Sequence, residues 1–349
     1  MRVAITGATG NVGTSLLRTL VDDRRILSII GISRRPPELE LDKTEWVAAD
    51  VGRDDLTTRF RGADAVVHLA WVIQPSRDLV ALRRTNVEGS ERVFEAAARA
   101  GVRTLVYASS VGAYSEGPKD EAVDESWPTE GISTSFYSRH KAEVERILDE
   151  FASAHPEIRV VRLRPGLIFS KEAASGIRRL FLGPFLPNGM VRAAFVPAVP
   201  APERLRFQAV HSLDVAEAYR LAVVGRASGA FNVAADPVIG TEELSEIFAA
   251  PRLPVPPRLL RWGAAASWRL RLQPTPEGWV DMGVSAPIMD TTRAQTELGW
   301  VPRYSSIEAL RALLEGLRAG AGYPTPVLAP DLPSIRVREL LSGLGKRGF

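Results

Sequence analysis

The 349-residue sequence contains no cysteine and only four histidines. The absence of cysteine excludes disulfide bonds, thiolate metal sites and a cysteine nucleophile, and it is compatible with a reducing compartment. The histidines are not spaced as metal ligands, so we expect no metal site. We interpret His68, His140 and His211 as structural residues.

Long apolar runs and a strong net charge are also missing. No apolar stretch approaches the roughly 18 residues of a transmembrane helix, and no signal-peptide pattern precedes the first glycines. The 44 basic and 41 acidic residues leave a net charge of only +3 and are scattered along the chain. We therefore expect a cytoplasmic protein with no membrane span and no nucleic-acid partner.

The first half of the chain alternates short apolar runs with amphipathic stretches. Strands are predicted at 3–5, 26–32, 46–48, 65–69, 104–107 and 160–163, and helices between them include 12–21 and 90–99. Strands separated by helices pair in parallel through right-handed crossovers. We predict a doubly wound α/β sheet of the Rossmann type, in which ligands bind outside the carboxyl ends of the strands.

Proline-rich sequence interrupts this alternation in the second half of the chain. We expect residues 1–169 to form the dinucleotide-binding domain, with 207–235 and about 286–295 returning to it; 210–223 and 230–234 are expected to rejoin the sheet. Residues 170–206, 236–285 and 296–325 are expected to form a smaller C-terminal substrate lobe, which includes an amphipathic helix at 259–272. Residues 326–349 form the tail, with a short helix at 337–341.

A glycine turn lies between the first predicted strand and the first predicted helix. Gly7, Gly10 and Gly13 are spaced by three residues. Glycine allows a positive φ and a close approach to phosphate, and the helix N-terminus supplies unpaired N–H groups. The pattern predicts a dinucleotide pyrophosphate site, and the alternative is a tight turn with a purely structural role.

The second predicted strand ends at Ser33-Arg34-Arg35, where NAD sites usually carry an acidic residue. Arginine matches a phosphate group in charge and in fork geometry. We therefore predict a preference for NADP(H) over NAD(H), and the alternative is that both arginines belong to a solvated loop. Asp50 and Val51 follow the third strand and are expected beside the adenine, although Asp50 fits a loop cap nearly as well.

A longer series of motifs follows the glycine turn in one order. It comprises Asp50, His68-Leu69-Ala70, Thr85-Asn86-Val87, Tyr107-Ala108-Ser109-Ser110, Tyr137-Ser138-Arg139-His140-Lys141, Arg164-Pro165-Gly166, Val210-His211-Ser212-Leu213-Asp214, Phe231-Asn232-Val233 and Glu297-Leu298-Gly299-Trp300-Val301-Pro302. This series resembles the extended short-chain dehydrogenase/reductase family, the NAD-dependent epimerase/dehydratase group, over nearly the whole chain. The resemblance implies a dinucleotide cofactor, a small-molecule substrate and a homodimer.

The resemblance also implies a catalytic set of Ser110, Tyr137, Lys141 and Asn86. Tyr137 and Lys141 are four residues apart and share one face of a predicted helix. A free tyrosine has a pKa near 10, and we expect the ammonium of Lys141 and an oxidised nicotinamide to lower it by roughly 3 units. Tyr137 would then exchange a proton with the substrate oxygen, which Ser110 holds; Ser109 is the competing choice.

The cofactor contacts that follow from the glycine turn and from the resemblance form one larger set. Its members are Gly7, Thr9, Gly10, Asn11, Val12, Gly13, Ser33, Arg34, Arg35, Asp50, Val51, Leu69, Ala70, Trp71, Asn86, Ala108, Ser109, Tyr137, Lys141, Pro165, Gly166, Leu167 and Ile168.

Two further features of the sequence restrict the type of reaction and the class of substrate. Val111-Gly112 follows Ser110 where the family's nucleotide-sugar 4,6-dehydratases carry an Asp-Glu pair, so that reaction is disfavoured. The substrate lobe is apolar at Phe181, Leu182, Phe185, Leu186, Met190, Phe195 and Val196. We favour an NADP(H)-dependent oxidoreductase acting on a small or moderately apolar alcohol or ketone.

Two other readings stay open. The first is a nucleotide-sugar 4-epimerase that reduces its cofactor only transiently, with the substrate diphosphate held by Arg178, Arg179, Arg192 and Arg204. The second is a non-catalytic regulator that senses NADP(H). Such a regulator has no use for an activated phenol, so the complete Ser110–Tyr137–Lys141 set argues against it.

Overall fold

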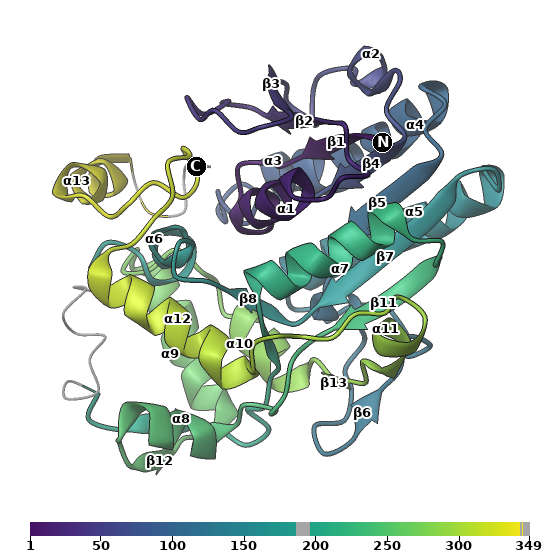
Figure 1. Cartoon of the computed structure of the whole chain (residues 1–349). Helices are drawn as coiled ribbons and strands as arrows, with labels where there is room; N and C mark the ends of the chain where they lie inside the picture. The colour runs from purple at the N-terminus through teal and green to yellow at the C-terminus, as the bar shows by residue number, and fades with distance from the viewer. Residues whose placement is uncertain (186–195, 343, 345–349) are drawn as a thin grey trace.

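A parallel sheet of seven strands forms the centre of the protein (Figure 1). The computed structural model describes residues 1–185, 196–342 and 344. The strand order is β11–β7–β5–β4–β1–β2–β3, and every neighbouring pair is parallel. The strands are β1 (Arg2–Thr6), β2 (Ser28–Ser33), β3 (Thr44–Ala48), β4 (Ala65–His68), β5 (Thr104–Ala108), β7 (Arg159–Pro165) and β11 (Gly229–Val233). The predicted doubly wound α/β fold is confirmed.

Both faces of the sheet are covered by helices, because its strands are apolar on both sides. Val3 and Ile5 of β1 pack in one core with α1 (Asn11–Val21) and α7 (Ser212–Val224). Ala4, which points to the opposite face, packs in a second core with α4 (Gly89–Arg99) and α5 (Phe136–Ala154). The predicted helices at 12–21 and 90–99 are therefore α1 and α4.

Most of the segment 210–223 returns to the central sheet as a helix that covers one face, and not as an added strand. Its first residues form β10 (Ala209–His211), which pairs with β8 (Leu167–Phe169) in a separate two-stranded sheet. The remainder is α7, whose apolar residues Val215 and Tyr219 are buried against the central strands. Residues 230–234 do rejoin the sheet, since β11 pairs with β7 at its edge.

The proline-rich part of the chain surrounds a separate core beyond the carboxyl edge. This core includes Ala174, Ala209, Ile239, Leu310 and Leu314.

The further helices are α2 (Thr57–Phe60), α3 (Leu79–Arg83), α6 (Ala174–Ile177), α8 (Thr241–Phe248), α9 (Pro257–Arg269), α10 (Gly278–Ser285), α11 (Thr292–Thr296), α12 (Ser306–Ala319) and α13 (Pro333–Ser342), and the further strands are β6 (Ala122–Val123), β9 (Val199–Ala201), β12 (Arg252–Pro254) and β13 (Ile288–Met289). The helices predicted at 259–272 and 337–341 correspond to α9 and α13. Within the described ranges, no helix combines the length and the apolarity needed to cross a bilayer.

The C-terminal segment folds back from α12 towards the start of α1, as the yellow end of the chain shows in Figure 1. A buried ion cluster anchors it, because Arg178 contacts Glu339 at 2.7 Å and Asp331 at 3.2 Å. Thr325 donates a hydrogen bond of 2.9 Å from its hydroxyl to the carbonyl of Thr9. The tail is therefore held directly against the glycine turn.

Candidate active site

The glycine turn packs against the segment that follows β4. Gly7 has a φ of +73°, and a Cβ there would lie 2.7 Å from the backbone of Ala70. A Cβ on Gly13 would lie 2.5 Å from the carbonyl oxygen of Gly7. Glycine is thus required at both positions, once for the positive φ and once for the close approach of two backbone segments. The resulting turn leads directly into the N-terminus of α1, which favours an anionic ligand.

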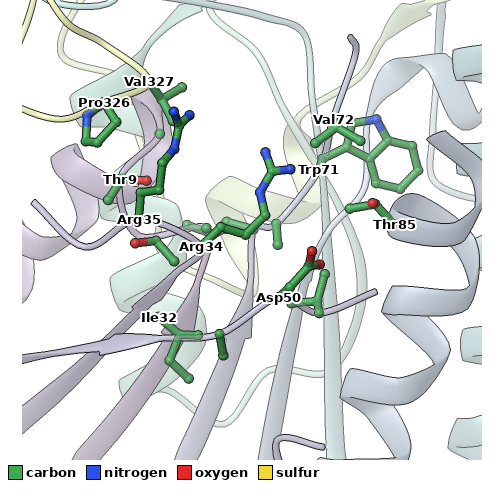
Figure 2. Close-up of a pocket in the computed structure, with 17 residues that line it drawn as sticks. Thr9, Ile32, Arg34, Arg35, Asp50, Trp71, Val72, Thr85, Pro326 and Val327 are labelled. Atoms are coloured by element: carbon green, nitrogen blue, oxygen red, sulfur yellow. The ribbon is translucent and has the colours of Figure 1, made fainter. Parts of the chain in front are cut away.

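A pocket opens beside this turn at the carboxyl ends of β1, β2, β3 and β4 (Figure 2). Eleven of the predicted cofactor residues line it: Gly7, Thr9, Gly10, Ser33, Arg34, Arg35, Asp50, Val51, Leu69, Ala70 and Trp71. Six lining residues were not predicted: Ile32, Ala49, Val72, Thr85, Pro326 and Val327. Thr85 belongs to the Thr85-Asn86-Val87 motif of the sequence analysis. No motif near Pro326 or Val327 identifies these two residues as cofactor contacts.

Arg34 and Arg35 both follow β2 and extend into the pocket in Figure 2. The side chain of Arg34 points into the pocket on the side where Asp50 and Trp71 lie, and that of Arg35 extends towards Val327. Asp50 lines the pocket and also caps its own loop, since its carboxylate accepts a hydrogen bond of 2.9 Å from the Gly52 N–H. Both predicted roles of Asp50 are therefore compatible with its position.

Two buried polar atoms in this pocket have no hydrogen-bond partner among the described residues. They are the Ser33 hydroxyl and the Trp71 indole N–H. Buried polar groups are normally paired, so each is a site where a ligand atom would restore a lost hydrogen bond. Together with the glycine turn and the two arginines, these atoms fit a dinucleotide cofactor.

The predicted catalytic side chains meet at the carboxyl end of β5. Ser110 precedes the 3-10 turn η2 (Val111–Ala113), and its hydroxyl lies close enough to Tyr137 of α5 to lower the pKa of that phenol. Ser109 is engaged on the other side, where its hydroxyl donates to the buried carboxylate of Glu145. The structure therefore favours Ser110 over Ser109 as the partner of Tyr137.

Lys141 lies one turn after Tyr137 and is buried. Its ammonium donates a hydrogen bond of 2.6 Å to the Ala108 carbonyl and lies 3.5 Å from the centre of the Trp71 ring. The amine is thus turned into the protein and away from bulk water. Burial lowers the pKa of Lys141 well below its usual range, while the Glu145 carboxylate opposes that shift.

In the protein without a cofactor, the pKa of Tyr137 is raised, whereas the sequence predicts that it is lowered. Burial raises the pKa of Tyr137 to about 12, and the hydrogen bond from Ser110 only partly offsets this. The Lys141 ammonium lies 5.9 Å from the centre of the tyrosine ring, and it is not among the groups that shift this pKa. Desolvation therefore outweighs the cationic neighbour, and the predicted lowering does not occur without a further positive charge.

Two tryptophans from distant segments enclose Tyr137. Trp71 meets its ring edge-on at 5.8 Å between centroids, and Trp279 of α10 lies over it at 4.9 Å. Trp279 in turn contacts Phe181 of the π-turn η3 (Arg178–Leu182) at 4.8 Å. The Trp279 indole N–H is also buried without a hydrogen-bond partner in the described residues. Tyr137 consequently lies in a site whose walls are aromatic.

Asn86 does not line the pocket but holds one of its walls in place. It lies in the π-turn η1 (Arg84–Glu88) and is fully buried. Its side-chain amide both accepts from the Val72 N–H and donates to the Val72 carbonyl, at 2.8 Å each. This pair of bonds fixes the segment that carries Trp71. Asn86 therefore positions the wall of the pocket.

The remaining predicted cofactor residues do not line this pocket. Asn11 instead joins α1 to β8, because its amide donates to the Ile168 carbonyl at 3.2 Å. The Gly166 and Leu167 N–H groups are bonded to the carbonyls of Val233 and Gln208. The residues outside the pocket are Asn11, Val12, Gly13, Asn86, Ala108, Ser109, Tyr137, Lys141, Pro165, Gly166, Leu167 and Ile168. Trp71 connects the two groups, since it lines the pocket and contacts both Tyr137 and Lys141.

The arginines considered for a substrate diphosphate have other partners. Arg178 is held by Glu339 and Asp331, and Arg179 donates to the carbonyls of Val327 and Ala329. Arg204 donates to the Gly117 carbonyl at 2.8 Å. Arg192 lies outside the described residues, as do the predicted lobe residues Leu186, Met190 and Phe195.

Comparisons with known proteins agree with this geometry. Residues 3–234 match the model of the NAD-dependent epimerase/dehydratase family. An uncharacterised protein of Mycobacterium tuberculosis (strain H37Rv) is 26% identical over 344 residues, covering 94% of this chain and 86% of that protein. The NAD(P)+-dependent L-arabinose 1-dehydrogenase of Haloferax volcanii is 29% identical over 182 residues, which is 49% of this chain and 68% of that enzyme.

A solved structure shows the same fold. The UDP-glucose 4-epimerase of Thermus thermophilus, in complex with NAD, aligns with a TM-score of 0.66 and 22% identity. The alignment covers 92% of this chain and 100% of that one.

Proposed function

Because this chain belongs to the NAD-dependent epimerase/dehydratase family, we propose that it is an NADP(H)-dependent oxidoreductase of alcohols and ketones. The observation that carries the proposal is the placement of the Ser110 hydroxyl beside Tyr137, with the buried Lys141 one helical turn away. A phenol next to a hydroxyl in a desolvated site can exchange a proton with a substrate oxygen held between them. No comparable arrangement is needed by a protein that only binds a dinucleotide.

The proton and the hydride take separate routes in the proposed reaction. An oxidised nicotinamide, when bound, supplies a positive charge and accepts a hydride. In the oxidative direction Tyr137 would accept the proton of the substrate hydroxyl. The carbon that bears this hydroxyl would give up its hydride to the cofactor and become a carbonyl carbon. Ser110 holds the oxygen during this step, while Trp71 and Trp279 exclude water from it. Reduction of a ketone runs through the same positions in reverse.

The preference for NADP(H) rests on the residues at the end of β2. Arg34 and Arg35 line the pocket, and neither β2 nor these two residues contributes an acidic group there. A 2′-phosphate would gain charge-assisted hydrogen bonds from the guanidiniums. Thermal shift should show greater stabilisation by NADPH than by NADH at equal concentration. Equal stabilisation of the wild type, or a preference that survives in Arg34→Ala/Arg35→Ala, contradicts this assignment.

The substrate side of the site favours an apolar molecule with a polar oxygen. Tyr137 is enclosed by Trp71 and Trp279, and Phe181 packs against Trp279; the N–H of each indole has no partner among the described residues. Arg178 and Arg179 are occupied by the C-terminal tail, which leaves them poorly placed to bind a diphosphate. We therefore place small or moderately apolar alcohols and ketones ahead of nucleotide sugars.

A nucleotide-sugar 4-epimerase is the second candidate, and the tail supports it. Pro326 and Val327 close one side of the pocket, and Thr325 is bonded to the glycine turn. A cofactor confined in this way would stay bound over many turnovers, as an epimerase requires. The two candidates differ in their net chemistry, because only an oxidoreductase changes the absorbance of the nicotinamide in step with the substrate.

The decisive variant is Tyr137→Phe. It removes only the hydroxyl, so NADPH binding and the melting temperature should stay unchanged while turnover falls at least a hundredfold. Steady-state assays with a panel of alcohols and ketones measure turnover, and NADPH fluorescence measures binding. A variant with full activity would refute the role of Tyr137. Loss of NADPH binding together with activity would instead point to a structural role.

A further inference from the structure

A long stretch of the chain contains arginines and no acidic residue. Between Glu246 and Glu277 there is no aspartate or glutamate, whereas five arginines occur: Arg252, Arg258, Arg261, Arg269 and Arg271. The chain as a whole carries 44 basic and 41 acidic residues, so this segregation is local. The stretch includes α9, which begins after three prolines and has Pro257 in its first turn.

An apolar stripe lies on the outer side of α9. Leu259, Trp262, Ala266 and Leu270 follow one another at intervals of three or four residues and so share one helix face. Leu259 is 57% exposed, and Trp262 and Leu270 are each 70% exposed. The opposite side of the helix faces the protein, where Ala265 is buried and Arg261 forms an ion pair of 3.0 Å with Asp281 of α10. Single exposed apolar residues are ordinary, but an ordered stripe of them marks an interaction surface.

Arginines border this stripe. Arg258 and Arg269 are exposed near the two ends of α9, and Arg271 with the exposed Leu272 follows directly. In the part of the chain that the structure describes, Arg258, Arg269 and Arg271 form no ion pair. The surface therefore combines apolar side chains with uncompensated positive charge.

We propose that α9 and the residues up to Leu272 bind the interface of an anionic lipid bilayer. A helix with tryptophan and leucine on one face and arginines beside them can place its apolar face among the acyl chains while the guanidiniums reach lipid phosphates. A second copy of the chain is a poor occupant. A two-fold contact through the stripe would bring the arginines of one copy against the same arginines of the other.

This surface is one element away from the catalytic side chains. α9 packs on α10 through the Arg261–Asp281 pair, and α10 carries Trp279, which lies over Tyr137. A bilayer bound by α9 would therefore lie on the side of the molecule where the apolar substrate site is formed. The lipid-binding proposal does not depend on that site being catalytic.

Vesicle sedimentation of the full chain tests the proposal. We expect the protein to sediment with vesicles of phosphatidylcholine and phosphatidylglycerol, to remain in solution with phosphatidylcholine alone, and to be released by added salt. Leu259→Glu/Trp262→Glu should reduce the bound fraction at least tenfold, and Arg258→Glu/Arg269→Glu should do the same. Circular dichroism melting confirms that each variant is folded.

Matched controls come from other faces of the protein. Leu27 and Val80 are 75% and 79% exposed, so Leu27→Glu and Val80→Glu change similarly exposed apolar residues and should leave sedimentation unchanged. The proposal is overturned by equal binding to neutral and anionic vesicles, by no binding, or by equal losses in the controls. It is also overturned if size-exclusion chromatography shows a dimer that Trp262→Glu dissociates, because the stripe would then bind a second copy.

Discussion

At the scale of single residues, the chemistry of Tyr137 depends on the balance between burial and charge. The protein surrounds this phenol with Trp71, Trp279 and the backbone of Gly112, and the resulting desolvation raises the pKa to about 12. In this environment Tyr137 is a hydrogen-bond donor and a poor base. A positive charge that arrives with the cofactor would reverse that state, so proton transfer would be coupled to cofactor binding.

A buried carboxylate lies one turn beyond Lys141 on α5. Glu145 is four residues after Lys141 on α5 and is fully buried. It pairs with Arg162 at 2.6 Å and with Arg164 at 2.9 Å, both from β7. The side-chain hydrogen bonds and charge interactions with these arginines, together with the Ser109 hydroxyl, outweigh desolvation and lower the pKa of Glu145 to about 2. This cluster joins α5 to β5 and β7 at the point where Ser110 and Lys141 are positioned.

We predict that Glu145→Gln lowers the free energy of unfolding by about 3–5 kcal/mol near pH 7, because the buried guanidinium of Arg164 loses its counter-charge and that of Arg162 keeps only the exposed Asp149. The folded-state pKa lies below the usual value of 4.5, so the carboxylate stabilises the fold fully above about pH 5 and loses that effect as the pH falls towards 2. Urea unfolding of both proteins between these pH values measures the difference. A difference in the free energy of unfolding between the wild type and Glu145→Gln that stays constant from about pH 5 to about pH 2 would contradict the assignment.

At the scale of elements, the tail is the part of the pocket that local sequence does not reveal. Its contact with the glycine turn joins Thr325 to Thr9, more than three hundred residues apart. Arg179 fixes the same segment through the carbonyls of Val327 and Ala329, at 2.8 Å each. Hydrophobic periodicity and turn motifs report neighbours along the chain, so neither indicates such a contact.

Val327→Asp tests the contribution of this tail to cofactor binding. The new carboxylate would face the phosphate-binding side of the pocket, and we expect the Kd for NADPH to rise about tenfold, equivalent to ~1.4 kcal/mol. Val337 of α13 is exposed, so Val337→Asp is the matched control and should bind NADPH as the wild type does. Fluorescence titration measures both Kd values. An unchanged Kd for Val327→Asp would show that the tail lies beside the pocket without contributing to it.

The elements that the sequence does predict are those with a repeated local pattern. β1, β4, β5 and β7 appear as short apolar runs because both of their faces are buried. β10 has a similar composition, yet it pairs with β8 outside the main sheet. Its partner is set by the connection after β7, which composition does not encode.

At the scale of the whole molecule, the fold brings four distant segments to one edge of the sheet. The glycine turn follows β1, Ser110 follows β5, Tyr137 lies in the first turn of α5, and Val327 comes from the tail. The position of the first three follows from the parallel topology, which explains why sequence motifs locate them. The aromatic enclosure by Trp279 could not be predicted, because it depends on how α10 docks against α5.

The central claim is that Tyr137 becomes a phenolate only when an oxidised cofactor lies beside it. Phenolate absorbance of the wild type minus that of Tyr137→Phe, titrated with and without NADP+, tests this claim directly. We predict no residue-137 phenolate up to about pH 10 in the free protein, since its pKa is about 12, and a phenolate appearing about 3 units lower with NADP+ bound. An identical titration with and without NADP+, when binding is confirmed independently, would contradict the account.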